Sequence, residues 1–184
     1  MILQDLKIDK TWSLFLDRDG VINKRIMGGY VKTWEQFEFL PGVLDALMVF
    51  LTHFNRIFVV SNQQGIGKEL MTIDQLELIH AKMQESIRKS GGKIDKIYFS
   101  PHLENENAFF RKPNIGMALK ARKDFPEVSL KKSIMAGDSL SDMLFGKRAK
   151  MTTVFLSCDA SLPKKHHRLI DFQYPDLITL AHAL

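Results

Sequence analysis

The stretch that decides the fold runs from Ser13 to Gly20 and reads SLFLDRDG. Its apolar run stops at charged residues and a glycine, which is typical of a buried strand in a parallel sheet. The run RIFVV at 56–60 ends in the same way, at Ser61 and Asn62. Similar runs predict further strands at 96–100, 133–136 and 153–156.

Helical patterns lie between these strands. They cover 43–54, 73–90 with Thr72 or Asp74 as the cap, 115–125 and 142–150, and a last helix at 174–184 is expected to pack on the sheet. Strands that alternate with helices imply right-handed crossovers, and therefore a three-layer, doubly wound α/β fold with a mainly parallel sheet. In such folds, ligands bind beyond the carboxyl ends of the strands.

Length and composition indicate a single globular domain over residues 1–184. A hydrophobic content of 45% is enough for one sizeable core. The net charge of +5 and the pI near 9.3 favour an anionic partner. Because Lys and Arg are scattered along the chain, a small phosphorylated molecule is favoured over nucleic acid. The basic cluster PKKHHR at 163–168 is expected to be a solvated loop.

Cysteine content and apolar patterning predict the cellular compartment and the solubility of the protein. The single cysteine, Cys158, has no partner for an internal disulfide and is expected to be an inert residue at a strand end, so a reducing cytoplasm is the simplest setting. The N-terminal sequence lacks the apolar stretch of a signal peptide, and no window approaches the roughly 18 to 20 apolar residues that span a bilayer. We therefore expect a cytoplasmic, soluble monomer without a membrane partner.

Two carboxylates follow the first predicted strand. Asp17 and Asp19 lie two residues apart, so their side chains point to the same side if the extended geometry persists. Neighbouring carboxylates repel each other unless a cation or a shared proton relieves them, and phosphoryl transfer can supply both. Aspartates are also common in ordinary turns after strands, so the pair alone leaves both interpretations open.

Two further groups of polar residues follow other predicted strands. The turn after Val60 offers the Ser61 hydroxyl and a nearby glycine to a phosphate oxygen, and we expect Asn62 and Gln63 to contact the substrate. Before a predicted helix, Lys112 would place a point charge on phosphoryl oxygens and Arg111 would bind the substrate with its planar fork. Exposed basic residues before a proline are otherwise unremarkable.

The segment AGDSLSD at 136–142 joins a predicted strand to a predicted helix. Asp138 is a candidate metal ligand, although Asp138 and Asp142 are equally typical of ordinary helix capping. Each motif is ambiguous alone. All of them lie at the ends of predicted strands, however, and the fold gathers these ends at one edge of the sheet.

In this order the motifs resemble the haloacid dehalogenase-like phosphatase superfamily. LFLDRDGVIN, GGYV, FLPGV, VVSNQQGIGK, FRKPNIGM and GDSLSDM are similar to its branch of D-glycero-D-manno-heptose 1,7-bisphosphate and histidinol phosphatases, over residues 13–156. The resemblance implies a magnesium-dependent phosphatase that forms an aspartyl-phosphate. It implies that Asp17 is the nucleophile and Asp19 the general acid and base, while Ser61 and Lys112 bind the phosphoryl oxygens. It also implies that Asp17, the Asp19 carbonyl and Asp138 bind Mg²⁺, that Asp142 orients this cluster and that Arg111 contacts the substrate.

Two features depart from that branch. Its members usually carry a zinc-binding loop with Cys-x-His and Cys-x-Cys before Arg-Lys-Pro, and these positions hold Ser100, His102, Ala108 and Phe110 in this chain. One imidazole cannot hold a tetrahedral zinc, so no zinc is predicted, and Phe109 and Phe110 are expected to anchor the loop by burial. Ser139 stands where the heptose enzymes typically have lysine, which leaves the substrate open.

The spacing of the motifs leaves no room for a cap domain. We therefore expect an open site shaped by the loops 24–40 and 100–111, where Tyr30 either offers an aromatic face to the substrate or packs on the core. The leading hypothesis is removal of the C7 phosphate from a heptose bisphosphate. Hydrolysis of histidinol phosphate is the main alternative, and a DNA 3′-phosphatase and a catalytically silent binding module are the others.

Overall fold

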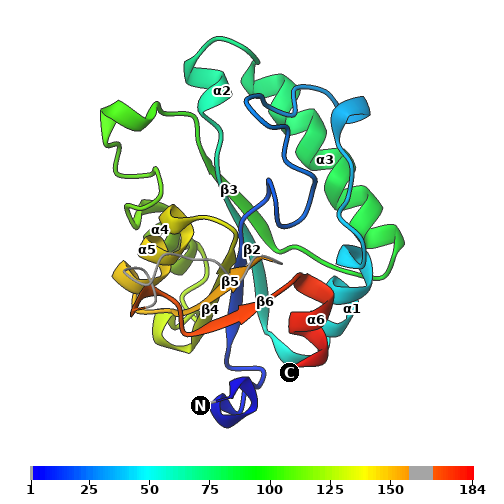
Figure 1. Ribbon diagram of the computed structural model, residues 1–184, viewed down its shortest axis with the longest axis vertical. Helices are drawn as coiled ribbons and strands as arrows, with labels where there is room; N and C mark the ends of the chain where they lie inside the picture. The colour runs from blue at the N-terminus through cyan, green and yellow to red at the C-terminus, as the bar shows by residue number, and fades with distance from the viewer. Residues whose placement is uncertain (1, 158–167) are drawn as a thin grey trace.

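Helices cover both faces of one parallel sheet in the computed structural model, which describes residues 2–157 and 168–184 (Figure 1). The strands are β1 (Ser13–Leu16), β2 (Arg56–Asn62), β3 (Lys96–Ser100), β4 (Ser133–Gly137), β5 (Thr152–Leu156) and β6 (Phe172–Tyr174). The helices are α1 (Val43–His53), α2 (Gln64–Gly67), α3 (Ile73–Lys89), α4 (Gly116–Asp124), α5 (Leu140–Arg148) and α6 (Leu177–His182). The predictions for Cys158 and for 163–167 fall outside the described residues.

The strand order places β1 at the point where the sheet changes direction. The order is β3-β2-β1-β4-β5-β6, and every neighbouring pair is parallel. The chain runs from β1 outward through β2 to β3 and then returns to the other side of β1 with β4. Leu16 pairs with Val59 of β2 and with Ala136 of β4, so the residues that follow these three strands meet at one edge. Doubly wound sheets bind ligands at this kind of position.

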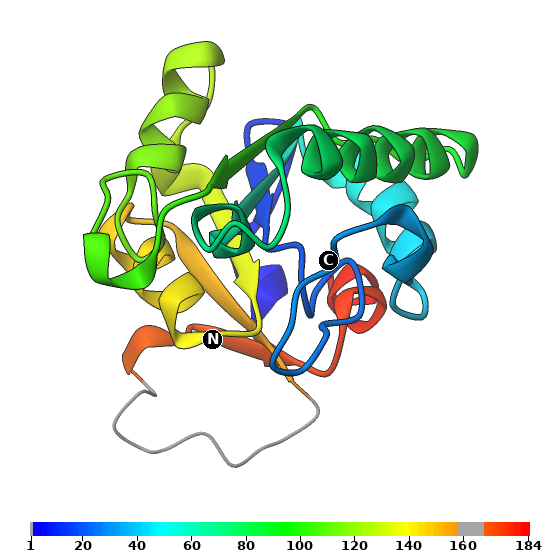
Figure 2. The same ribbon diagram turned by 90° about the horizontal axis from the view of Figure 1, so that it is seen from above.

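The two faces of the sheet bury separate apolar clusters. Figure 2 shows α1, α3 and α6 on one face and α4 and α5 on the other. Leu14 and Leu16 belong to the first cluster, whereas Phe15 belongs to the second and lies 4.9 Å from Phe58, ring centre to ring centre. Alternate side chains of a strand point to opposite faces. Burial on both faces therefore explains why β1 is a continuous apolar run and not an alternating one.

The end of the chain corrects the prediction of one helix over 174–184. Phe172–Tyr174 pairs with β5 as an edge strand, and α6 begins only at Leu177. Asp176 caps this helix, because its side chain accepts a hydrogen bond of 2.9 Å from the backbone N–H of Thr179. The helix packs on α1 and buries Leu177 in the first cluster, so the expected packing of the chain end is confirmed.

Helix α5 begins two residues before the predicted start. Ser139 caps it: the hydroxyl accepts a bond of 3.3 Å from the Asp142 N–H, and the Asp142 carboxylate accepts one of 3.1 Å from the Ser139 N–H. This reciprocal arrangement is a capping box. Asp142 is therefore the third residue of the helix and not its cap.

The connections contain no cap domain within the described residues. The segment between β1 and α1 is loop apart from a short 3-10 turn at Trp34–Gln36, and only α2 and α3 lie between β2 and β3. No helix among the described residues combines the length and the apolar character needed to cross a membrane.

Candidate active site

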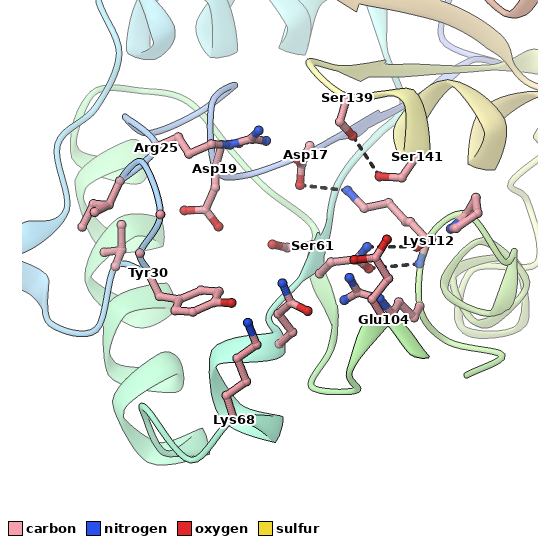
Figure 3. Close-up of a pocket in the computed structure, with 18 of the residues that line it drawn as sticks. Asp17, Asp19, Arg25, Tyr30, Ser61, Lys68, Glu104, Lys112, Ser139 and Ser141 are labelled. Atoms are coloured by element: carbon pink, nitrogen blue, oxygen red, sulfur yellow. Dashed lines mark hydrogen bonds and ion pairs between the residues drawn. The ribbon is translucent and has the colours of Figure 1, made fainter. Parts of the chain in front are cut away.

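A cavity of about 570 Å³ opens at the carboxyl edge of the sheet (Figure 3). Four segments line it, namely the loop after β1, the end of β2 with α2, the loop after β3 and the turn after β4. The polar lining residues are Asp17, Asp19, Arg25, Tyr30, Ser61, Asn62, Gln64, Lys68, Glu104, Asn107, Arg111, Lys112, Ser139 and Ser141. The predicted convergence of the motifs on one site is therefore seen in the geometry.

Asp17 and Lys112 form a buried ion pair at the base of this cavity. The Lys112 Nζ lies 2.8 Å from Asp17 Oδ1, and it donates to Asp142 Oδ1 at 2.6 Å and to the Val60 carbonyl at 2.7 Å. These contacts use the three donors of the ammonium group. Asp17 is 6% exposed and Lys112 is 2% exposed, so both charges are held with little help from water.

Three carboxylates lie close together beside this lysine, and two of them contact it. One ligand oxygen each from Asp17, Asp138 and Asp142 can be chosen so that all three lie within 4.8 Å of one another. Burial raises the pKa of Asp17 to about 7 and that of Asp138 to about 6, although Lys112 opposes the first shift and Arg25 the second. Burial also disfavours charged Lys112, but Asp142 and Asp17 outweigh it and raise its pKa. Ionisation of Asp17 and Asp138 is therefore disfavoured at this site, and a further cation beside them would relieve this.

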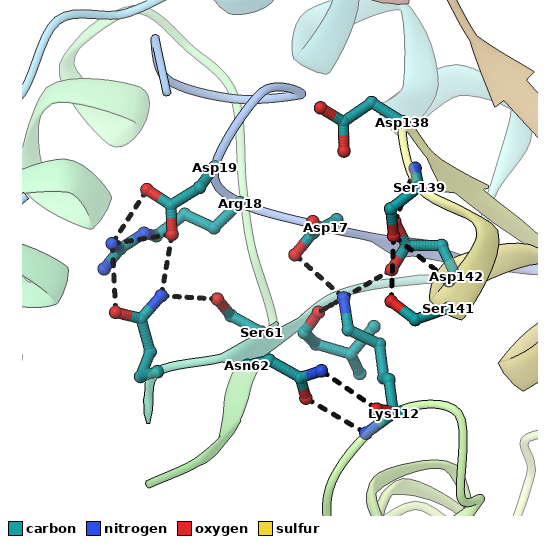
Figure 4. A network of polar contacts seen from close by, with 12 residues as sticks. Asp17, Arg18, Asp19, Ser61, Asn62, Lys112, Asp138, Ser139, Ser141 and Asp142 are labelled. Atoms are coloured by element: carbon teal, nitrogen blue, oxygen red, sulfur yellow. Dashed lines mark hydrogen bonds and ion pairs between the residues drawn. The ribbon is translucent and has the colours of Figure 1, made fainter. Parts of the chain in front are cut away.

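The donor atoms of the cluster fit a magnesium ion. Mg²⁺ prefers hard oxygen ligands, and carboxylates are foremost among them. Both oxygens of Asp142 are already in use, by Lys112 on one side and by Ser139 on the other, where the hydroxyl lies 2.5 Å away. Asp17 and Asp138 consequently remain as the carboxylates that can face a metal, and Asp142 orients Lys112 (Figure 4).

A glycine makes the approach of Asp138 to the first loop possible. Gly20 has a φ of +95°, and a Cβ atom placed on it would lie 1.9 Å from Asp138 Oδ2. No other residue fits there without moving the carboxylate, and a positive φ disfavours any residue with a side chain. The glycine of the DRDG motif therefore brings the segments after β1 and β4 into contact.

The Asp19 carboxylate accepts hydrogen bonds from three polar side chains beside the cavity. It accepts bonds from Arg18 Nη2 at 2.9 and 3.0 Å, from Asn23 at 2.9 Å and from Gln63 at 2.7 Å. Burial opposes its ionisation, but the Arg18 guanidinium and these hydrogen bonds hold the pKa of Asp19 below its usual range. Arg18 is fully buried, and its Nη1 lies 3.1 Å from the His80 Nε2. The carboxylate is therefore ionised and held beside the cavity.

The residues after Ser61 have different surroundings. Gln63 was expected to contact the substrate, but it is 1% exposed, does not line the cavity and donates to Ser61 Oγ at 2.6 Å as well as to Asp19. The next residue, Gln64, lines the cavity. Asn62 also lines it, while its amide group makes two 3.0 Å bonds to the backbone of Lys112. Asn62 thus ties Lys112 to the end of β2.

Arg111 and Tyr30 lie on the wall of the cavity, as expected for residues that could contact a ligand. Arg111 is 9% exposed and donates to the His102 carbonyl at 3.1 Å. Lys68 Nζ lies 5.6 Å from the centre of the Tyr30 ring, a cation–π geometry. Tyr30 also packs against the first apolar cluster, as one interpretation expects, and its contact with a substrate stays a prediction.

Sequence reasoning missed two cations of the cavity, Arg25 and Lys68. Arg25 Nη2 lies 2.9 Å from the Asp19 carbonyl and 2.8 Å from Asp138 Oδ1. Lys68 ends the motif VVSNQQGIGK but was given no role in it, and Arg25 follows Lys24 in a loop outside the motifs. Only the three-dimensional placement of their loops beside the carboxylates distinguishes them.

The loop before Arg111 corrects one expectation. Phe110 is partly buried against the second apolar cluster, but Phe109 is 59% exposed and does not anchor the loop. His102 lies 2.7 Å from Glu106, and Ser100 is buried within β3. The expected absence of zinc stays a prediction.

Comparisons with known proteins agree with the geometry. Residues 14–180 match the family described as polynucleotide kinase 3 phosphatase. The chain is 42% identical over 147 residues to the D-glycero-alpha-D-manno-heptose-1,7-bisphosphate 7-phosphatase of Campylobacter jejuni, which covers 80% of this chain and 83% of that protein. It is 36% identical over 169 residues to the D-glycero-beta-D-manno-heptose-1,7-bisphosphate 7-phosphatase of Helicobacter pylori, covering 91% and 96%.

A solved structure resembles the whole fold. It is the D,D-heptose 1.7-bisphosphate phosphatase from B. bronchiseptica complexed with magnesium and phosphate, with a TM-score of 0.81 at 26% identity, covering 93% of this chain and 96% of that one. These matches extend over almost all of the sheet and all of the motifs at its carboxyl edge. The chain therefore belongs to the polynucleotide kinase 3 phosphatase family, within the haloacid dehalogenase-like superfamily.

Proposed function

We propose that this protein is a magnesium-dependent phosphatase that removes the 7-phosphate of D-glycero-D-manno-heptose 1,7-bisphosphate through an aspartyl-phosphate at Asp17. The observation that carries this proposal is the position of the Asp17 carboxylate, which lines the cavity beside Lys112 and shares a site with Asp138. The names of the Campylobacter jejuni and Helicobacter pylori relatives support the substrate. The magnesium and phosphate in the B. bronchiseptica structure support the chemistry.

The nucleophile acts in two displacements at one phosphorus atom. An oxygen of Asp17 attacks phosphorus, the bond to the sugar oxygen breaks, and the leaving oxygen takes a proton from Asp19. Asp19 then removes a proton from water, whose oxygen attacks the same phosphorus and releases phosphate and free Asp17. A covalent intermediate divides one difficult step into two easier ones.

Positive charge around the phosphoryl group lowers both barriers. Lys112 would turn the donor that reaches Asp17 toward a phosphoryl oxygen, and the Ser61 hydroxyl would hold another. Asp17, the Asp19 carbonyl and Asp138 would hold Mg²⁺. The bound ion would neutralise charge on the phosphate and on the two carboxylates. Lys112 is in place for its role before substrate arrives, because Asn62 and Asp142 hold it from two sides. Such preorganised charge is an effective way to stabilise a transition state.

Asp19 needs a proton for the first step, whereas its contact with Arg18 favours the ionised form. A phosphorylated substrate brings negative charge next to this carboxylate, and a like charge raises the pKa of a carboxyl group. We infer that Asp19 takes up its proton when the substrate binds. Arg18 and Gln63 then position the carboxyl group and do not touch the substrate.

The substrate can be tested against the alternatives in one assay. Phosphate release is followed by ³¹P NMR with both anomers of the heptose bisphosphate, histidinol phosphate and a 3′-phosphorylated oligonucleotide, each with Mg²⁺ and with a chelator. The oligonucleotide is included because the matched family is described as polynucleotide kinase 3 phosphatase. Both anomers are included because the relatives are named for different ones.

The proposal expects fastest release of the 7-phosphate from a heptose bisphosphate, and only with Mg²⁺. Asp17→Asn should lower the rate by at least about 10³-fold while the fold is kept. A higher kcat/KM for the oligonucleotide than for the heptose bisphosphate, with a steep loss of rate as the salt concentration rises, would show that the substrate is a nucleic acid and not a sugar phosphate. Unchanged turnover by Asp17→Asn would contradict the enzyme mechanism.

A further inference from the structure

Arg25 contacts both of the groups that are proposed to hold magnesium together with Asp17, namely the Asp19 carbonyl and the Asp138 carboxylate. Its Nη2 donates to the Asp19 carbonyl at 2.9 Å and to Asp138 Oδ1 at 2.8 Å, and its Nε lies 3.2 Å from the same carbonyl. The guanidinium is thus placed between a carbonyl oxygen and a carboxylate oxygen. Figure 3 shows the Arg25 side chain extending toward Asp19 and Asp17 at the edge of the cavity.

The charge balance explains why a cation lies there. Lys112 is directed at Asp17 and Asp142, and Asp138 is not among its contacts. Among the ion pairs of residues 2–157 and 168–184, the only partner of Asp138 is Arg25. Asp138 is largely buried, with a side chain that is 18% exposed, and a buried carboxylate without a cation is costly. Arg25 therefore compensates the charge of Asp138.

A metal ion and this guanidinium cannot occupy the same contacts. Mg²⁺ binds oxygen at about 2.0 to 2.1 Å and demands a nearly octahedral arrangement, so its ligand oxygens must point at the ion. A guanidinium 2.8 Å from Asp138 Oδ1 and 2.9 Å from the Asp19 carbonyl would lie next to a second cation bound to the same two groups. Like charges at this distance repel. Magnesium and Arg25 therefore compete for these two groups.

The Arg25 side chain is free to move away from these two groups. It is 44% exposed, in contrast to the buried Lys112, and it lies in a loop that lines the cavity and continues through Gly28 and Gly29. The bound ion would supply the positive charge that Asp138 loses, so displacement of the half-exposed guanidinium leaves no buried carboxylate without a cation. Its long stem allows the charge to move into the cavity or into water.

We propose that Arg25 is a built-in substitute for the metal, which holds Asp138 and the Asp19 carbonyl together in the metal-free protein and competes with Mg²⁺ for them. The proposal rests on the metal site of the proposed function. It assigns Arg25 a positioning role toward the metal and not a role in the chemical step. Two consequences follow, namely weaker metal binding than the same site would have without Arg25, and a better ordered site when no metal is present.

The first test measures metal affinity directly. Free Mn²⁺ is counted by electron paramagnetic resonance during titration of the protein, since Mn²⁺ prefers the same oxygen ligands, and Mg²⁺ is added as competitor. Arg25→Gln is compared with Lys24→Gln, which removes the same charge from the same loop. Lys24 is a matched control because it is exposed and lies 3.4 Å from Glu38, away from the carboxylate cluster.

Arg25→Gln should bind both ions about two- to fivefold more tightly than the wild type, which is the scale of one exposed ion pair converted to a binding ratio. Lys24→Gln should bind as the wild type does. Equal affinities in the two variants, or weaker binding by Arg25→Gln, would overturn the competition. Absence of stoichiometric binding in the wild type and in both variants would instead remove the metal site of the proposed function.

The second test uses thermal unfolding. In chelator, Arg25→Gln should melt at a lower temperature than Lys24→Gln, because Asp138 has lost its cation. With saturating Mg²⁺ the two melting temperatures should coincide, since the ion replaces the guanidinium. A difference that persists in Mg²⁺, or no difference in chelator, would contradict the substitution of one cation by the other.

Discussion

The Nζ atom of Lys112 lies 2.8 Å from the Oδ1 atom of Asp17, and both side chains are buried. Asp17 follows β1, which pairs with β4 and β2, and its backbone N–H donates to the Ala136 carbonyl at 3.1 Å. Lys112 is attached to β2 through Asn62 and to α5 through Asp142. Asp17 and Lys112 are therefore positioned by separate segments at the carboxyl edge of the sheet, and the following expectations test that arrangement.

Replacement of Lys112 by methionine should affect stability and activity together. The variant leaves Asp17 and Asp142 buried without their cation, and breaking a buried ion pair costs about 3 to 5 kcal/mol. We expect a loss of this size in urea unfolding of the metal-free protein at pH 8, and a fall in kcat of at least about 100-fold in Mg²⁺. Lys89→Met, at an exposed i,i+4 pair with Glu85, is the control and should leave both quantities nearly unchanged.

Gly20→Ala should damage the metal site specifically. A Cβ at this position would lie 1.9 Å from Asp138 Oδ2, so the carboxylate has to move. We expect metal affinity to fall by about 10- to 100-fold, the scale seen when the supports of metal ligands are removed. Gly28→Ala is a matched control, because Gly28 also has a positive φ but nothing lies within 4 Å of its added Cβ. Equal metal affinities of the two variants in the Mn²⁺ titration would show that backbone strain alone matters.

Gln63→Met tests whether this residue positions Asp19 or binds substrate. Gln63 is buried and bridges Asp19 and Ser61, whereas its neighbour Gln64 lines the cavity. We expect kcat of Gln63→Met to fall by about 10- to 100-fold with little change in KM, because the acid and base is misplaced. Gln64→Met should change KM more than kcat. The opposite pattern in steady-state kinetics would restore the original assignment of Gln63 to the substrate.

The buried His80 predicts a pH-dependent stability that does not depend on catalysis. Burial lowers its pKa to about 3, and the Arg18 charge acts in the same direction. In the unfolded chain His80 takes up a proton near pH 6.5, whereas in the folded protein it stays neutral down to about pH 3. The contribution of neutral His80 to the free energy of unfolding is therefore complete above pH 6.5 and is lost as the pH falls toward 3. Between pH 6 and 4, the free energy of unfolding in urea should fall by about 1.4 kcal/mol less per pH unit in His80→Gln than in the wild type. A slope for His80→Gln equal to that of the wild type would contradict this expectation.

The central strands could be predicted from the sequence because burial on both faces makes them continuous apolar runs. Strands β1 and β3 have the predicted bounds, and β2, β4 and β5 differ from the prediction by one or two residues. The edge strand β6 could not be found in this way. It has three residues, none of them fully buried, and pairs on one side with β5, so it carries no apolar run.

The same distinction holds for the site. Asp17, Asp19, Ser61, Lys112 and Asp138 follow strands or precede helices, and topology alone brings such positions to one edge. Arg25 reaches the cavity through the course of its loop, which no local pattern specifies. Lys68 ends a motif and follows α2, but the motif alone does not show that its side chain reaches the cavity. Gln63 lies in a motif, but its orientation toward the buried Arg18 depends on packing that one sequence does not reveal.

The central claim is that phosphate passes through Asp17. The most direct measurement is rapid acid quench of the enzyme during turnover of the heptose bisphosphate, followed by borohydride reduction, which converts an aspartyl-phosphate to homoserine, and mass spectrometry of the peptides. We expect homoserine at position 17, dependent on Mg²⁺ and substrate, and none in Asp17→Asn. Phosphate release at full rate without any modification at Asp17, or with the modification on another residue, would contradict it.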